Sequence, residues 1–193
     1  MKWGLPLWDL LRLRGVSRGA EPSTPRSASR SEAGSTETRS KSPRRHAVQD
    51  RYDALVEEMK ATWGLKVRKW RTSTSGVAWE TVWANGSRSR MIESPYPRGP
   101  MSCAVFLHEV GHHAIGLATI KPRCLEEKRA WDWSLREMRG RGFNVTDRVL
   151  ARRDDALRYA VAKSLRRRIR RLPVEMEPWL PAGVTLELET TTC

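Results

Sequence analysis

Apolar residues first recur at helical spacing between positions 52 and 63, where they would form one face of a helix that a core can bury. Five of them match the i, i+3, i+4, i+7, i+11 pattern of an amphipathic helix: Tyr52, Leu55, Val56, Met59 and Trp63. Gly64 follows as a stop signal, so the pattern predicts a helix that begins near residue 47. Segments rich in β-branched and aromatic residues follow at 65–71, 77–83 and 90–94, separated by turn sequences. They predict a small three-stranded antiparallel sheet.

Three further helices are predicted in the second half of the chain. Prolines end the last strand, and Ser102 is placed to cap a helix over 103–115. A second helix covers 125–138 and ends before a pair of glycines. Thr146 is placed to cap a long basic helix over 147–171, which a proline stops. Strands followed by helices predict an α+β fold, with the sheet packed on the helix over 103–115.

The first 46 residues carry little that a core could bury. Residues 16–46 are mostly Ser, Thr, Arg, Pro and Glu, which predicts a disordered basic tail. Tryptophans and leucines between Trp3 and Leu13 could form a short amphipathic helix before it. The expected organisation is a tail over 1–46, one folded domain over 47–180 and a C-terminal tail over 181–193.

The overall charge of the chain is strongly positive. Lys and Arg outnumber Asp and Glu by 36 to 22, which gives a formal net charge of +14 and favours contact with nucleic acid or acidic surfaces. The three cysteines contain no CxxC pair, so neither a disulfide framework nor a thiolate zinc cluster is indicated. No apolar run approaches the roughly 20 residues that span a bilayer. These features predict a cytoplasmic protein without a transmembrane segment.

The strongest chemical signal is the sequence Phe-Leu-His-Glu-Val-Gly-His-His over 106–113. His108 and His112 are four positions apart, so both imidazoles project from one face of the predicted helix and can hold one ion. Glu109 lies beside that face, where it can reach an activated water. The flanking residues are apolar or small, and unpartnered imidazoles would be costly to bury among them. The segment therefore predicts one zinc ion per chain, with Glu109 as the catalytic base.

A third ligand is needed, because catalytic zinc commonly has three protein ligands and one open position. The next helix offers Glu126, Glu127 and Asp132. At about 100° per residue, Glu127 falls at the centre of the buried face and Glu126 nearer its edge. Glu127 is the predicted ligand and Glu126 the alternative, because Pro122 leaves the phase of the first turn open. If neither binds, Asp132 or a residue of the long basic helix would complete the site.

These motifs together resemble a known family. The run from Arg-Met-Ile-Glu-Ser-Pro-Tyr-Pro through the two histidines to Leu-Glu-Glu-Lys-Arg-Ala-Trp-Asp-Trp-Ser is similar to the ImmA/IrrE-like metallopeptidases, minimal zincins common in phages and mobile elements. The resemblance covers about residues 47–172. It implies a zincin-like fold and the gluzincin set of two histidines and one glutamate.

Peptide hydrolysis is the predicted activity. Zinc would lower the pKa of a water, and Glu109 would accept the proton and return it to the leaving amine. An extended peptide substrate would pair with the strand over 90–96. Tyr96 and Tyr159 are candidate oxyanion donors, although tyrosines more often serve in packing.

A basic regulatory or nucleic-acid-associated protein with a zincin-like fold is the competing hypothesis. Arginines over 166–171, together with Lys163, form a concentrated positive segment that could contact phosphates, as could the N-terminal tail. No recognised DNA-reading motif accompanies this segment. Loss of metal-dependent proteolysis in Glu109→Gln would favour the enzyme, whereas salt-dependent DNA binding that ignores this substitution would favour the competing hypothesis.

Overall fold

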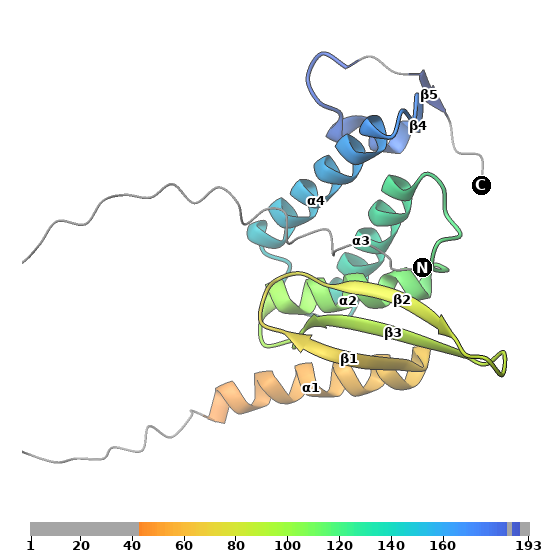
Figure 1. Ribbon diagram of the computed structural model, residues 1–193. Coiled ribbons are helices and arrows are strands. Elements are labelled where there is room, and N and C mark those ends of the chain that lie inside the picture. The colour runs from red at the N-terminus through yellow and green to blue at the C-terminus, as the bar shows by residue number, and fades with distance from the viewer. Residues whose placement is uncertain (1–42, 185–186, 190–193) are drawn as a thin grey trace, which may run out of the picture.

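The computed structural model describes residues 43–184 and 187–189 (Figure 1). Residues 1–42, which hold the expected amphipathic segment and most of the expected N-terminal tail, lie outside the described residues. The elements follow in this order: α1 (Pro43–Trp63), β1 (Leu65–Arg71), β2 (Val77–Val82), β3 (Arg88–Pro95), α2 (Pro100–Ala114), α3 (Arg123–Gly140), α4 (Asp147–Arg166), β4 (Arg171–Pro173), the 3-10 helix η2 (Val174–Trp179) and β5 (Glu187–Glu189). The fold is α+β, as predicted. Among the described helices, none is both long and apolar enough to cross a membrane.

The three-stranded sheet is mixed, so the prediction of an antiparallel sheet is wrong. Its strand order is β1-β3-β2, with β3 parallel to β1 and antiparallel to β2. The second half of β3, from Ile92 to Pro95, is buried, whereas β1 and β2 are partly exposed. The most buried strand therefore takes the centre of the sheet and separates its two neighbours. The segment 90–96, expected to bind a peptide along its edge, consequently has both sides of its strand occupied.

Helix α2 is the centre of the molecule, because every residue from Cys103 to His113 is buried. It packs against β3 and α3, while α1 contacts β1 and α2, and α4 packs against α3 (Figure 1). The shared core contains the largest buried side chains of these helices, among them Met59, Phe106, Trp131 and Leu157. Burial on all sides explains why the two histidines of α2 lie inside the protein.

Several helix ends differ from those that the sequence predicted. The first helix begins at Pro43 rather than near residue 47, so residues 43–46 are helical and not part of a disordered tail. Helix α2 begins at Pro100 with Gly99 as its N-cap and no side-chain cap, since a proline at the first position has no N–H to satisfy. The Ser102 hydroxyl instead donates to the Gly99 carbonyl oxygen at 3.1 Å. Thr146 caps α4 as predicted, but the helix ends at Arg166 because residues 171–173 form β4 and pair with β5. The long basic helix is therefore shorter than expected.

Helices α2 and α3 approach each other closely at Gly111. A Cβ at this position would lie 2.9 Å from the carbonyl oxygen of Ala130 and 3.2 Å from the ring of Trp133. Further along the same contact, the buried Ser134 hydroxyl donates to the Ala104 carbonyl oxygen at 2.8 Å. The crossing places the first turns of α3 directly beside the histidines of α2.

Alanine substitutions at Gly111 and Gly140 should have opposite effects on the free energy of unfolding. Gly111→Ala should destabilise the metal-free protein by about 1–3 kcal/mol, because the new methyl group overlaps backbone that cannot move freely. Gly140→Ala should stabilise it by about 0.5–1 kcal/mol, since a Cβ there meets no atom within 4 Å and alanine favours the helix. Urea unfolding in the presence of a chelator measures both. Equal stability of the two variants would contradict close packing at Gly111.

Candidate metal centre

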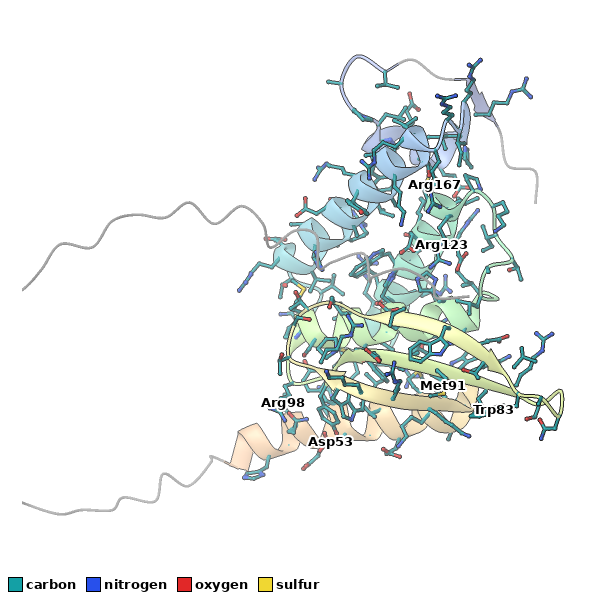
Figure 2. The ribbon with its side chains drawn as sticks, in the orientation of Figure 1. Asp53, Trp83, Met91, Arg98, Arg123 and Arg167 are labelled. Carbon is teal, nitrogen blue, oxygen red and sulfur yellow. The ribbon has the colours of Figure 1, made fainter. Side chains whose placement is uncertain are left out.

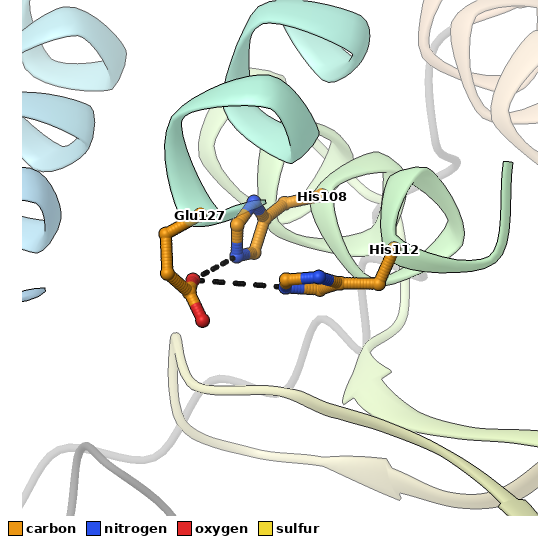
Figure 3. A group of neighbouring side chains, drawn as sticks. All are labelled: His108, His112 and Glu127. Atoms are coloured by element: carbon orange, nitrogen blue, oxygen red, sulfur yellow. Dashed lines mark ion pairs between the residues drawn. The ribbon is translucent and has the colours of Figure 1, made fainter. Parts of the chain in front are cut away.

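Three buried side chains from two helices converge on one point. His108 and His112 project from α2, and Glu127 projects from the first turns of α3 (Figure 3). The Oε2 atom of Glu127 lies 3.3 Å from Nε2 of His108 and 3.6 Å from Nε2 of His112. One ligand atom of each residue lies within 4.8 Å of the others. The structure thus contains a His/His/Glu group at metal-binding distances.

Glu126, the alternative ligand, occupies a different position. Its side chain is fully buried, and its Oε1 atom lies 3.0 Å from Nδ1 of His112, the ring nitrogen turned away from Glu127. The same oxygen accepts a hydrogen bond from the Ala118 backbone N–H at 3.3 Å. Glu126 therefore bonds the ring nitrogen of His112 that faces away from Glu127, and so orients the imidazole. Asp132 lies outside the group, because it is bonded to Lys128 at 2.7 Å and its side chain is 39% exposed.

Arg123 joins the two glutamates and was not singled out from the sequence. Its Nη1 donates to Oε1 of Glu126 at 2.9 Å, and its Nε donates to Oε1 of Glu127 at 3.0 Å. The contact leaves Oε2 of Glu127 directed toward the two imidazoles. The i, i+3 and i, i+4 spacing of these residues is the sequence signal that could have identified Arg123.

The buried groups have strongly shifted pKa values. Burial lowers the pKa of His108 to about 4, so this imidazole is neutral. Burial also acts against the charged form of His112, but Glu127 and Glu126 raise its pKa to about 10. For Glu127 burial raises the pKa, yet His112 and His108 outweigh it and hold the value well below 4.5. The carboxylate is therefore ionised between the two rings.

Glu109 is buried next to this group, under the loop that joins β1 to β2. Burial raises the pKa of its carboxyl to about 8. A Cβ on Gly76 in the loop would overlap Oε1, Cγ and Cδ of Glu109. The loop is fixed by Arg71, which donates to the Ser75 hydroxyl at 3.0 Å, and by Arg152, which donates to the Thr74 carbonyl oxygen at 2.9 Å. Sequence reasoning missed Gly76, because no local pattern signals a close approach to a distant helix.

The two tyrosines considered as oxyanion donors have other partners. The Tyr96 hydroxyl donates to Oδ1 of Asp53 on α1 at 2.8 Å, and its ring packs on Trp70. The Tyr159 ring on α4 lies under the guanidinium of Arg166, with 5.6 Å from that group to the ring centroid. The structure therefore directs Tyr96 toward α1, whereas the role of Tyr159 stays a prediction.

The sequence matches no protein-family model, and neither a curated protein nor a solved structure is significantly similar to it. The meaning of the His/His/Glu group therefore depends on its own geometry and chemistry.

The low pKa of Glu127 predicts a pH dependence of stability. Its ordinary value is 4.5, so the ionised carboxylate stabilises the metal-free fold above that pH, and this contribution is lost as the pH falls through the lower folded-state pKa. Glu127→Gln should therefore lose less stability on acidification than the original protein does. Urea unfolding with a chelator at decreasing pH measures this difference, with Glu57→Gln on an exposed part of α1 as control. If the free energy of unfolding of Glu127→Gln fell with decreasing pH as steeply as that of the unsubstituted protein, the low pKa of Glu127 would be contradicted.

Proposed function

We propose that this chain is a zinc-dependent metallopeptidase with a zincin-like fold, similar to the ImmA/IrrE-like metallopeptidases. In this proposal His108, His112 and Glu127 bind one zinc ion, and Glu109 is the catalytic base. The observation that supports it most directly is the buried His/His/Glu group beside a further buried carboxyl. Two imidazoles and one carboxylate are the ligand set of many catalytic zinc sites, in which a fourth position stays open.

The surroundings of the ligands favour metal binding. Zinc binds a neutral imidazole, and burial keeps His108 in that form. The glutamates favour the protonated form of His112 in the metal-free protein, so zinc would have to displace the proton of Nε2, while the contact from Glu126 keeps the other proton on Nδ1. Arg123 fixes the plane of the Glu127 carboxylate in the same way. A bound cation would also offset the cost of burying these polar groups.

Glu109 is suited to move a proton. When bound, zinc acts as a Lewis acid and lowers the pKa of a water. Glu109 accepts the proton of the attacking water and returns it to the leaving amine. Its burial and the contact with Gly76 hold the carboxyl in one place. This burial also favours the protonated carboxyl in the metal-free protein, and a nearby cation favours the ionised base that the reaction needs.

A peptide substrate needs a strand with free backbone groups close to the base. Strand β2 pairs only with β3, so its other edge has no strand partner among the described residues. It follows directly after Gly76, and therefore begins beside Glu109. We assign the peptide-binding edge to β2, where an extended substrate can add as a further strand.

The proposal predicts distinct metal affinities for variants of the two adjacent glutamates. The protein should hold about one equivalent of zinc, and His108→Ala or Glu127→Ala should abolish stoichiometric binding because three ligands are the minimum for such a site. Glu126→Ala should keep the stoichiometry but weaken affinity by about 10- to 100-fold, as expected for a residue that orients a ligand. Elemental analysis and chelator competition measure these effects, with Asp132→Ala as control. An equal loss of zinc affinity in Glu127→Ala and Glu126→Ala would contradict the assignment of Glu127 as the ligand.

Glu109→Gln should retain zinc but lose turnover by about 10²- to 10⁴-fold, since the amide keeps the shape and cannot accept a proton. Cleavage of a proteome-derived peptide library, read by mass spectrometry, measures the activity. If Glu109→Gln cleaved the peptides as fast as the unsubstituted protein, Glu109 would be excluded as the base.

A companion variant tests the position of the base rather than its chemistry. Gly76→Ala should reduce turnover, because its methyl group would displace the Glu109 carboxyl, whereas zinc content should not change. Gly99→Ala is the matched control, since a Cβ there meets no atom within 4 Å. Equal turnover of both alanine variants would show that the contact with Gly76 does not position Glu109.

A further inference from the structure

Four cations gather where the end of α4 meets the first turn of α3: Arg123, Lys163, Arg166 and Arg167. The two helices are joined here by a hydrogen bond between the buried side chains of Cys124 and Ser164. Figure 2 shows Arg123 and Arg167 on the same side of α3 and α4. We call these four residues the cationic band.

The cationic band borders the candidate metal centre. Arg123 donates directly to Glu127. Burial lowers the pKa of Lys163, Arg167 lowers it further, and Glu127 is close enough to oppose the shift. Lys163 is therefore near enough to interact electrostatically with Arg166, Arg167 and the proposed ligand Glu127.

Three members of the band, Lys163, Arg166 and Arg167, are neighbours at the end of α4 and have no carboxylate partner among the described residues. Elsewhere on α3 and α4, ion pairs join Lys128 to Asp132, Arg129 to Glu175, Arg141 to Glu58 and Glu137, Arg153 to Asp154, and Arg158 to Asp155. In the described part of the chain, Lys163, Arg166 and Arg167 form no ion pair. A helix C-terminus favours cations, but side chains at i, i+3 and i+4 with the same charge repel one another. A negatively charged ligand would remove this repulsion.

We propose that the cationic band binds acidic side chains of the peptide substrate, so that the site prefers sequences with Asp or Glu on one side of the cleaved bond. This inference rests on the proposed peptidase function and names the substrate class of that site. Because Arg123 contacts a proposed ligand, the acidic residues should fall within a few positions of the cleaved bond. A peptide fits better than a nucleic acid, because Arg123 joins the band directly to the proposed ligand Glu127, so a peptide held for cleavage there would extend over the band.

Matched internally quenched peptides test the preference. They share one central sequence and differ only in flanks of Asp/Glu, Ser or Lys. The acidic peptide should have a kcat/KM about tenfold or more above that of the basic peptide, and the ratio should shrink at high salt. The double variant Lys163→Glu/Arg167→Glu should lose or reverse the preference. The control Arg136→Glu/Arg139→Glu, which changes two exposed cations near the other end of α3, should keep it.

Binding to zinc-loaded Glu109→Gln separates this inference from the proposed activity. Tighter binding of the acidic peptide, lost in the Lys163→Glu/Arg167→Glu background, supports the inference without any turnover. Equal affinity for acidic and basic peptides overturns it, and so does tighter binding of duplex DNA through the same two residues. Acidic-peptide binding together with no cleavage by the original protein would overturn the peptidase proposal and leave the ligand class of the band standing.

Discussion

The close crossing of α2 and α3 is the contact on which the candidate metal centre depends. Gly111 lets the backbone of α3 approach at Ala130, and Ser134 ties the helices together one turn further on. Glu127 lies one turn before Ala130 and therefore reaches the imidazoles of His108 and His112 with a short side chain. Side chains in a packed interior cannot adjust freely, so a wider helix separation would withdraw the carboxylate from both rings.

The crossing also forces ionisable groups into a small buried volume. Burial penalises charge, yet Glu127 remains ionised because the two imidazoles and Arg123 surround it. Glu126 bonds the outward-facing Nδ1 of His112 and Arg123 bonds Oε1 of Glu127, which fixes the orientation of both ligand side chains. Such a cluster is a poor source of stability, since desolvation opposes each favourable pair. In the proposed metal site, the ligands would thus be oriented before a cation binds.

The sequence predicted those parts of the structure that depend on local geometry. Spacing of four residues placed His108 and His112 on one helix face. The helical phase put Glu127 at the centre of the buried face and Glu126 nearer its edge, which is wrong because Glu126 is the more buried of the two, although it is Glu127 whose carboxylate lies near both imidazoles. Sequence reasoning failed where distant segments decide the outcome. The central position of β3 follows from which strand the helices bury most, and no pattern within 65–71 indicates parallel pairing with 88–95. Ser102 was wrongly assigned as a cap because Pro100 already supplies a favourable helix start.

The loop between β1 and β2 connects Glu109, the proposed base, to the proposed substrate-binding edge. Gly76 contacts Glu109, and the next residue begins β2. Since successive strand residues advance by about 3.3 Å, a substrate paired with β2 has its register set from the point where the base is held. Arg71 and Arg152 fix this loop to the sheet and to α4. In the proposed peptidase, movement of the loop would therefore displace Glu109 and a peptide paired with β2 together, so one segment would keep the proposed base and the cleaved bond aligned.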